Sequence, residues 1–228
     1  CALPIYRTIV EAMAKRNEGV FRTDFVNSGI SDGASLTEAL EELEQCGFLR
    51  GYKNATKKER GICYQLIDPF SRFALSFLQE NTLGSWQAYY GTPSYDSWSG
   101  NAFELLCLNN IAAIKSALGI SGVLTEVHSW YCRANADEGL FGSQADLLIV
   151  RRDQVINVCE MKYASANYTF TKKDDEAMRR RISDIQAATG TRYALHPTLV
   201  TTYGIRKSQY WVAVQAAIVA DDLFRPLD

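Results

Sequence analysis

The chain has 228 residues, with 24 Lys and Arg against 26 Asp and Glu, and 47% of its residues are hydrophobic. A chain of this length forms one or two domains and buries enough surface to need no disulfide or metal for its core. Its composition excludes disordered, collagen-like and coiled-coil proteins. No apolar run approaches the roughly 18 residues of a membrane span, so we expect no membrane partner and a cytoplasmic location. The formal net charge of -2 provides no general attraction to nucleic acid.

Residues 1–68 are predicted to form a winged helix-turn-helix, an α+β domain. Apolar side chains recur at helical spacing over 5–14, a short helix is expected over 22–28, and a third helix over 35–46. Two strands follow, and a polar, basic loop connects them. Three helices followed by a hairpin are the element order of a winged helix.

The charges of this domain argue against a reader of the major groove. Its third helix would be the recognition helix, yet the polar face of that helix carries glutamates and no Lys or Arg, although DNA presents one phosphate charge per ~1.7 Å. These glutamates are Glu38, Glu41, Glu42 and Glu44. Only the loop between the strands is basic, and its candidates for phosphate contacts are Lys53, Lys57 and Lys58. We therefore expect a coupling or protein-contact module, with phosphate contacts limited to the wing.

Residues 69–100 are predicted to be a helix and an aromatic-rich connector. Asp68 and Pro69 are typical of a helix start, and the helix is expected to reach about residue 80. The segment 82–100 is rich in Trp, Tyr, Gly, Ser and Pro and has no clear periodicity. We interpret it as a connector whose aromatic side chains pack beneath it.

Residues 101–228 are predicted to form an α/β domain with a mixed sheet. The order of elements is a helix, three strands, a second helix and further strands. The expected helices are 101–118 and 171–189, and the expected strands are 123–131, 145–150, 155–162, 193–201 and 213–219.

Acidic residues interrupt two adjacent apolar strands of this domain. Asp146 lies in one strand, and Glu160 and Lys162 lie two residues apart in the next, so their side chains share one face. Glu104 is the only acidic residue of the preceding helix. Burying several charges costs several kcal/mol per ion unless they pair or bind a cation. This pattern predicts a functional site, and the alternative is a structural salt bridge of Lys162 with Glu160 or Asp146.

Glu104, Asp146 and the Glu160-x-Lys162 pair resemble the layout of the PD-(D/E)XK nuclease superfamily, whose fold is restriction-endonuclease-like. The rest of the chain is similar to archaeal-type AAA+ ATPases, in which a nucleotide-binding domain, a winged helix and a nuclease-like domain follow one another. The residues that carry this resemblance are the runs 64–73, 145–149, 158–163 and 201–205.

The resemblance implies Mg²⁺ or Mn²⁺ bound by Asp146 and Glu160, with the backbone carbonyl of Met161 as a further ligand. It implies that Glu104 holds a second ion or positions the first. Lys162 would orient the attacking water or neutralise the phosphorane, and the metal would activate that water. Weaker candidates for substrate contacts are Gln144, Arg180 and Arg181.

Two features depart from the family pattern. Ala145 stands where a proline is common, and this departure is tolerable because the proline binds no metal. No G-x-x-x-x-G-K-[ST] motif is present, so ATP is expected only in a missing N-terminal ATPase domain. Because the chain begins at Cys1 without a methionine, we expect that this domain has been removed.

Two hypotheses about function follow. The first is a metal-dependent phosphodiesterase, a nuclease-like domain acting on DNA, from a protein that is an ATPase. The second is a catalytically inactive regulatory or protein-interaction module on the same fold, which the neutral overall charge favours. The candidate partners are DNA, the missing ATPase domain and further copies of the chain.

Overall fold

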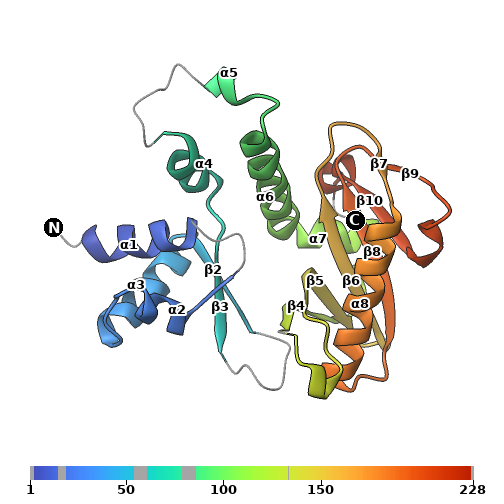
Figure 1. The fold of residues 1–228 in the computed structure, drawn as a ribbon, viewed down its shortest axis with the longest axis horizontal. Coiled ribbons are helices and arrows are strands. Elements are labelled where there is room, and N and C mark those ends of the chain that lie inside the picture. The colour runs from blue at the N-terminus through green and yellow to red at the C-terminus, as the bar shows by residue number, and fades with distance from the viewer. Residues whose placement is uncertain (1–2, 15–18, 54–60, 79–85, 133, 227–228) are drawn as a thin grey trace. The chain divides into compact units, whose positions relative to one another are not determined.

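The computed structural model describes residues 3–14, 19–53, 61–78, 86–132 and 134–226 (Figure 1). The chain divides into two compact units, one of residues 1–53 and 60–102 and the other of residues 54–59 and 103–228. Helices and a five-stranded mixed sheet confirm the predicted α/β class. In the described part of the chain, no helix combines the length and the apolar character that crossing a bilayer requires.

In the N-terminal part of the first unit, three helices pack with a three-stranded antiparallel sheet of order β1-β3-β2. Its core is formed by side chains such as Ile9, Phe25, Leu36 and Leu40. The strand β1 was not expected, because two residues are too short to show a periodicity. The elements are α1 (Leu3–Ala14), β1 (Val20–Phe21), α2 (Arg22–Asn27), α3 (Ala34–Gln45), β2 (Leu49–Lys53) and β3 (Ile62–Leu66).

The four glutamates of α3 are exposed, while its apolar side chains are buried. Two of these glutamates are used within the unit. Glu42 accepts a hydrogen bond from the Tyr6 hydroxyl, and Glu44 Oε1 accepts one from the Gly51 amide at 2.9 Å. The acidic face of α3 therefore helps to fix α1 and β2 against this helix.

The segment 82–100 was interpreted above as a connector without periodicity, but its residues 86–89 and 93–100 are helical, so that interpretation was wrong for this part. α6 (Pro93–Asn109) begins inside it, after the short helix α5 (Trp86–Tyr89). The start of α6 is determined by Thr92, whose hydroxyl accepts from the Tyr95 amide at 3.3 Å, and by Pro93 at the first helical position. Small polar residues hide the helical period in the sequence.

Aromatic rings hold this part of the first unit together. Trp98 of α6 packs edge-on against Phe73 and Phe77 of α4 (Pro69–Phe77), with ring centroids 5.8 and 6.0 Å apart. Tyr89 packs on Phe77 at 5.1 Å. As predicted, α4 starts at Asp68, whose carboxylate accepts from the Ser71 amide at 2.7 Å.

The second unit contains a five-stranded sheet of order β10-β8-β6-β5-β4, in which β4, β5 and β6 are antiparallel and β6, β8 and β10 are parallel. A two-stranded parallel sheet, β7 with β9, was not predicted. The elements are α7 (Ile111–Ala117), β4 (Thr125–Cys132), β5 (Ser143–Arg151), β6 (Val155–Lys162), β7 (Tyr168–Thr169), α8 (Lys172–Thr189), β8 (Ala194–Thr201), β9 (Ile205–Arg206) and β10 (Ala216–Val219), with 3₁₀ turns at Ala136–Glu138, Trp211–Ala213 and Ala220–Phe224.

The helix expected over 101–118 is divided into the end of α6 and α7. Asn110 breaks it, since its backbone is non-helical at φ -119° and ψ 36°. The Asn110 side chain donates to the Leu106 carbonyl at 2.8 Å, as an asparagine at a helix end commonly does. The Glu104 side chain is therefore carried by α6.

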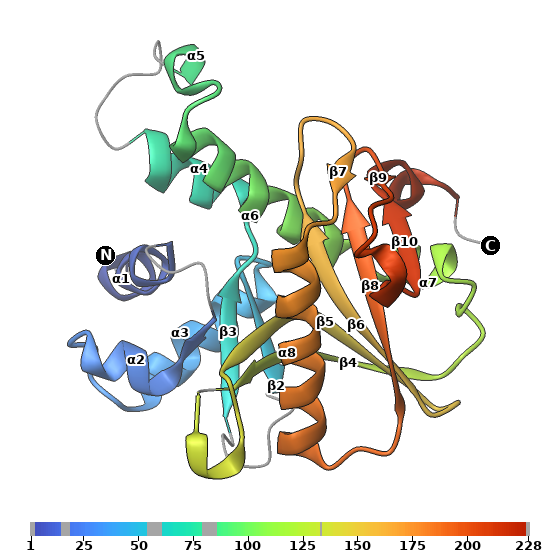
Figure 2. The same ribbon diagram turned by 45° about the vertical axis from the view of Figure 1, so that its right-hand side comes forward.

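Helices pack on both faces of the five-stranded sheet. On one face, Cys107 and Ile114 of α6 and α7 join Leu147, Cys159 and other inward side chains. On the other face lies α8 (Figure 2), and its Met178 and Ile185 pack in a separate cluster, together with Trp130, Leu148, Val158 and others. Because side chains alternate along β6, Glu160 and Lys162 share the α8 face with Val158.

A buried carboxylate secures α8 to the loop before β5. Asp184 is fully buried, and its carboxylate accepts from the Phe141 amide at 2.8 Å and from the Cys132 thiol at 3.6 Å. These two donors precede Asp184 by 43 and 52 residues. Asp184 thus fixes the position of the helix that also carries Arg181.

Replacing Asp184 with alanine is expected to lower the free energy of unfolding by about 1–3 kcal/mol, because the hydrogen bonds that this buried carboxylate accepts from the Phe141 amide and the Cys132 thiol would be lost. Urea denaturation followed by circular dichroism measures this change. The control is Ser183→Ala at the neighbouring exposed position, expected to stay within about 0.5 kcal/mol. Equal stability of the two variants would contradict the structural role of Asp184.

Candidate functional site

The candidate site lies where β5 and β6 separate. Their ladder runs from Val150 and Ile156 to Leu147 and Cys159, and beyond this pair β6 continues alongside β8. Asp146 is the next residue of β5, and its carboxylate accepts the Met161 amide hydrogen at 2.7 Å. A side chain thus takes the place of the backbone partner that the ladder no longer provides.

Three carboxylates influence one another at this point. Burial raises the pKa of Asp146 well above its usual range, and the negative charges of Glu160 and Glu104 raise it further. The hydrogen bond from Met161 and the charge of Arg181 act in the opposite direction but do not outweigh the increase. The structure therefore brings together the three acids selected from the sequence, and a cation beside Asp146 would relieve their repulsion.

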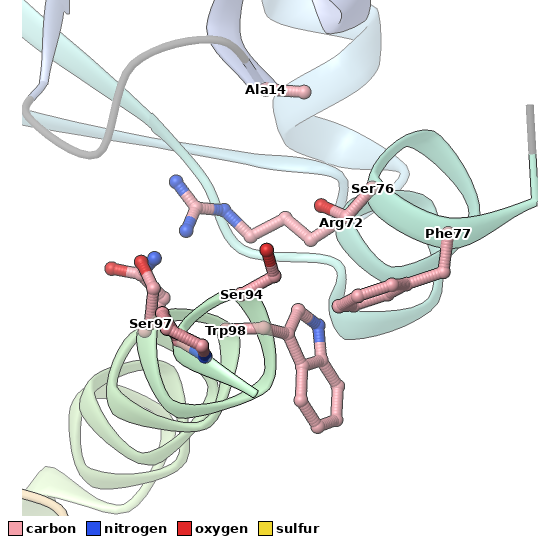
Figure 3. A pocket seen from close by; sticks show the side chains of 9 residues that line it. Ala14, Arg72, Ser76, Phe77, Ser94, Ser97 and Trp98 are labelled. Carbon is pink, nitrogen blue, oxygen red and sulfur yellow. The ribbon is translucent and has the colours of Figure 1, made fainter. Parts of the chain in front are cut away.

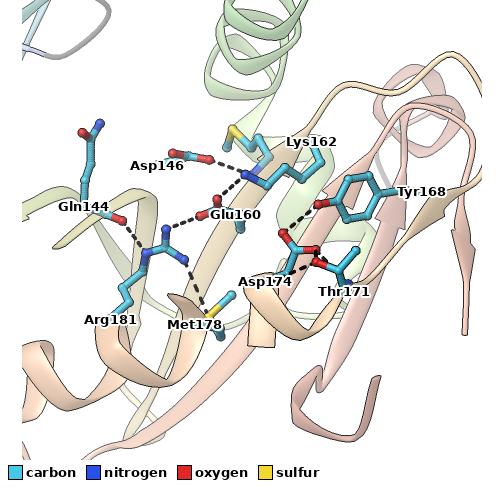
Figure 4. A network of polar contacts seen from close by, with 10 residues as sticks. Gln144, Asp146, Glu160, Lys162, Tyr168, Thr171, Asp174, Met178 and Arg181 are labelled. Atoms are coloured by element: carbon cyan, nitrogen blue, oxygen red, sulfur yellow. Dashed lines mark hydrogen bonds and ion pairs between the residues drawn. The ribbon is translucent and has the colours of Figure 1, made fainter. Parts of the chain in front are cut away.

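Glu160 lies between two cations (Figure 4). Its Oε1 is 2.6 Å from Lys162 Nζ, and its Oε2 is 2.8 Å from a terminal nitrogen of Arg181. The side chains of Glu160 and Arg181 are only 13% and 12% exposed, so solvent screens this contact weakly. Breaking a buried pair of this kind by removing one partner leaves a charge uncompensated.

Lys162 remains a cation in this setting. Burial lowers the pKa of its ammonium, but the charge and hydrogen bond of Glu160 raise the pKa by more, and Asp146 adds to this increase. The net result is a raised pKa. Lys162 can therefore donate hydrogen bonds and neutralise an anion, whereas it is a poor general base at neutral pH.

A cavity of about 230 Å³ adjoins Glu160, Lys162 and Arg181. Beside it, the Tyr168 hydroxyl donates to Asp174 Oδ1 at 2.8 Å, and Asp174 Oδ2 also accepts from the backbone amide and hydroxyl of Thr171. Thr171 and Asp174 form the capping box of α8, so one carboxylate stabilises the helix start and one wall of the cavity (Figure 4).

Two titratable groups of this wall, Asp174 and Tyr168, have shifted pKa values. Burial raises the pKa of Asp174, but the hydrogen bonds from Thr171 and Tyr168 and the charge of Lys162 outweigh it, so the pKa is lowered. Burial first, and then the hydrogen bond to Asp174, raise the pKa of the Tyr168 phenol. Near neutral pH the wall therefore presents a carboxylate and a neutral phenol.

The remaining predicted residues are divided between the two units. Gln144 lies on β5, and its backbone carbonyl accepts from Arg181 Nε. Arg180 is exposed on α8 and has no part in this network. Lys53 ends β2 of the first unit, and Lys57 and Lys58 fall outside the described residues.

Sequence reasoning missed part of the site. Arg181 was considered only as a substrate contact, yet it is a direct partner of Glu160. The Thr171-x-x-Asp174 spacing signals a helix cap, and that signal was available in the sequence. Tyr168 carried no such signal, because its role depends on a loop that returns to the start of α8.

The donor set at Asp146 fits a hard divalent cation in part. Among the residues that the structure describes, no three His, Cys, Asp or Glu side chains converge as ligands of one ion. Mg²⁺ needs no such cage, because one or two carboxylates, waters and substrate phosphates usually complete its shell. The Met161 carbonyl is suitable as well, since the N–H and C=O of one strand residue point to the same side, and here that side faces Asp146.

A larger cavity of about 490 Å³ lies in the first unit (Figure 3). Arg72 of α4 points into it past Ser94, and Trp98 closes one end beside Phe77. Among the described residues of its lining, Arg72 is the only ionisable side chain. These described residues include no acid and base pair, so the candidate chemistry stays with the smaller cavity of the second unit.

Comparison with known proteins yields no match among protein-family models, curated proteins or solved structures. The function must therefore be argued from the geometry and charges of this chain.

The pKa of Asp146 leads to a prediction about stability and pH. A carboxyl whose pKa is higher in the folded state than in the unfolded chain binds its proton more tightly when folded, so it lowers stability as pH rises above about 3.9. We expect Asp146→Asn to lose this decline and, without metal, to be at least as stable as the wild type at pH 7. Urea titrations between pH 4 and 8 in chelator test this.

Asp221→Asn, at an exposed position of the same unit, is the matched control and should keep the wild-type profile. A clear loss of stability in Asp146→Asn at pH 7 would show that the ionised carboxylate holds the fold together.

Proposed function

We propose that the second unit is a metal-dependent phosphodiesterase that hydrolyses DNA. The observation that carries this proposal is the meeting of Asp146, Glu160 and Lys162 at the divergence of β5 and β6, where the pKa of Asp146 is raised by burial, Glu160 and Glu104. A purely structural ion pair would not require the excess of negative charge around Asp146.

Each residue has a role in this proposal. Asp146 and Glu160, with the Met161 carbonyl, would hold Mg²⁺ or Mn²⁺, and Glu104 would position the ion or a second one. When bound, the metal supplies a water of lowered pKa and offsets charge on the scissile phosphate. Lys162 donates from a permanently charged ammonium, so it is placed to orient the water or to stabilise the phosphorane.

Arg181 is part of this machinery as a positioning residue. It ties Glu160 to α8 and to the Gln144 carbonyl at the same time. A carboxylate held from two sides keeps its direction, and preorganised charges are the largest contribution to many enzymatic rates. Removing the guanidinium would leave Glu160 with Lys162 as its counter-charge.

The competing function is a catalytically inactive regulatory or protein-interaction module. One observation favours it: Lys162 and Arg181 already compensate Glu160, so the pair is complete without metal. In this alternative, the acids stabilise the domain and the acidic face of α3 contacts a protein. Metal binding and cleavage distinguish the two functions.

The finer fold assignments belong to the same proposal. The order α1, α2, α3 and the antiparallel β2–β3 pair support a winged helix in the first unit. The five-stranded mixed sheet with helices on both faces supports a nuclease-like fold in the second. We further propose that these units function with an ATPase domain of the archaeal AAA+ type, which would supply ATP hydrolysis.

Cleavage tests the catalytic proposal directly. Plasmid and single-stranded DNA should be cut in Mg²⁺ or Mn²⁺, and Asp146→Asn, Glu160→Gln and Lys162→Ala should each lower the rate by about 100-fold or more, because each removes charge from the reacting centre. Gel assays measure the rates, and Asp221→Asn should cut like the wild type. No cleavage by the wild type, or equal cleavage by the variants, would refute catalysis.

Thermal unfolding tests metal binding without any assay of activity. At a metal concentration ~100 times the dissociation constant, the wild type should gain ~2.7 kcal/mol of stability, and Asp146→Asn should gain nothing. Stabilisation that is lost in Asp146→Asn but occurs without cleavage would favour the regulatory module. If the metal stabilised the wild type and Asp146→Asn equally, it would bind at a site that does not include Asp146.

A further inference from the structure

The cavity beside Glu160 has the composition of a site for one nucleotide. Its lining combines the Tyr168 and Phe170 rings and the Met178 and Leu199 side chains with three cations, Lys162, Lys173 and Arg181. Among the described residues, the acids of the lining are Glu160 and Asp174, so the cations of this set exceed its acids by one. An apolar, partly aromatic wall with a net positive rim is suited to a planar ring that carries an anion.

Both acids of the lining are already engaged. Glu160 pairs with Lys162 and Arg181, while Asp174 accepts from Thr171 and Tyr168. Lys173 is exposed, and within the described ranges it has no ion-pair partner, in contrast to Lys172, which is 3.7 Å from Glu176. One cation at the rim is therefore available to an incoming phosphate.

The size of the cavity limits what can enter. Its volume of about 230 Å³ is below the ~300–1,000 Å³ typical of pockets for drug-sized ligands. A single unstacked base suits such a space, whereas an intact base pair is too large for it. A base within a duplex would first have to leave its partner and its stack, at a cost of roughly a few kcal/mol that an unpaired base does not meet. Enzymes that take a base out of the stack hold it in a pocket of this kind, between aromatic or apolar side chains.

We propose that this cavity binds an unpaired nucleotide next to the phosphate being cut, so that the substrate is single-stranded or frayed DNA. The proposal rests on the function proposed above, because Glu160 and Lys162 belong to both the cavity and the reacting centre. The base would lie against the half-buried Tyr168, behind which the buried Phe170 packs, and the adjacent phosphate would face Lys173.

The test measures binding in chelator, where nothing is cut. Fluorescence anisotropy compares a labelled single-stranded oligonucleotide, its duplex, and an abasic strand of the same length and charge. Ala177 is exposed and lines the cavity, so Ala177→Leu should fill it and weaken single-strand binding about tenfold. The matched control, Ala187→Leu, adds the same side chain at an exposed position of the same helix outside the cavity and should have no effect.

The abasic strand separates base binding from phosphate binding. If a base occupies the cavity, the wild type should bind this strand more weakly than the normal one, and Ala177→Leu should add no further loss. Lys173→Ala should reduce the slope of log affinity against log salt by about 1, and Lys172→Ala, at the neighbouring exposed position, should not. This second pair keeps the proposal testable if Ala177→Leu does not fold.

The proposal is overturned if the wild type binds no single strand. It is also overturned if duplex and single strand bind equally and Ala177→Leu changes neither affinity, or if Ala177→Leu lowers the affinities for the normal and the abasic strand equally. Cleavage that depends on Asp146, with binding insensitive to Ala177→Leu, would reject the cavity and keep the phosphodiesterase. Single-strand binding that Ala177→Leu weakens, without any cleavage, would keep the cavity as a binding site and reject the phosphodiesterase.

Discussion

The candidate site depends on the hydrogen bond between the Asp146 carboxylate and the Met161 amide. The β5–β6 ladder ends one residue earlier, and this single contact bridges the strands where their backbones part. It places a carboxylate beside the strand that carries Glu160 and Lys162. It also leaves that carboxylate among like charges, because α6 contributes Glu104 and β6 contributes Glu160. The separation of two strands thus creates the position and the electrostatic character of the site.

A second constraint acts from the side of α8. Arg181 compensates Glu160 and contacts the Gln144 carbonyl, while Asp174 fixes Tyr168 and the start of the helix. The buried Asp184 holds the same helix to the loop before β5. Three polar residues at different turns of one helix therefore position the cavity, the ion pair and the loop. A shift of α8 would disturb all three together.

Much of the fold could be predicted from the sequence, for reasons that individual residues make clear. The apolar runs around Asp146 and Glu160 predicted two strands, and the helix expected over 171–189 ends as predicted, before Gly190 with its left-handed backbone. The start of α6 was missed, because three serines, an aspartate and a glycine mask its period, and its cap, Thr92, is a weak signal on its own. The break at Asn110 was missed as well, since it depends on a side chain bonding back to its own helix.

The acids on the strands could also be selected from the sequence, because a charge buried in an apolar strand is costly unless it is paired or binds a cation. The partners of these acids could not be selected in this way. Arg181 lies 21 residues after Glu160, and the face of α8 that meets the sheet is set by Met178, Ile185 and Asp184 and not by charge. The cavity wall depends on Tyr168, which lies on the short strand β7 before the helix. Such contacts arise from the packing of elements and leave no local pattern.

The raised pKa of Asp146 has an evolutionary consequence. A carboxyl whose ionised form is disfavoured by burial and like charges makes the fold less stable, so stability and the proposed chemistry impose opposite demands at this position. Under the proposed function, a lineage that no longer cut phosphodiesters would replace this carboxylate first, with an uncharged side chain that still accepts the Met161 amide hydrogen. Glu160, secured by two cations, would persist much longer as an ordinary ion pair. The order in which these two acids disappear among descendants would then record when the proposed catalysis was lost.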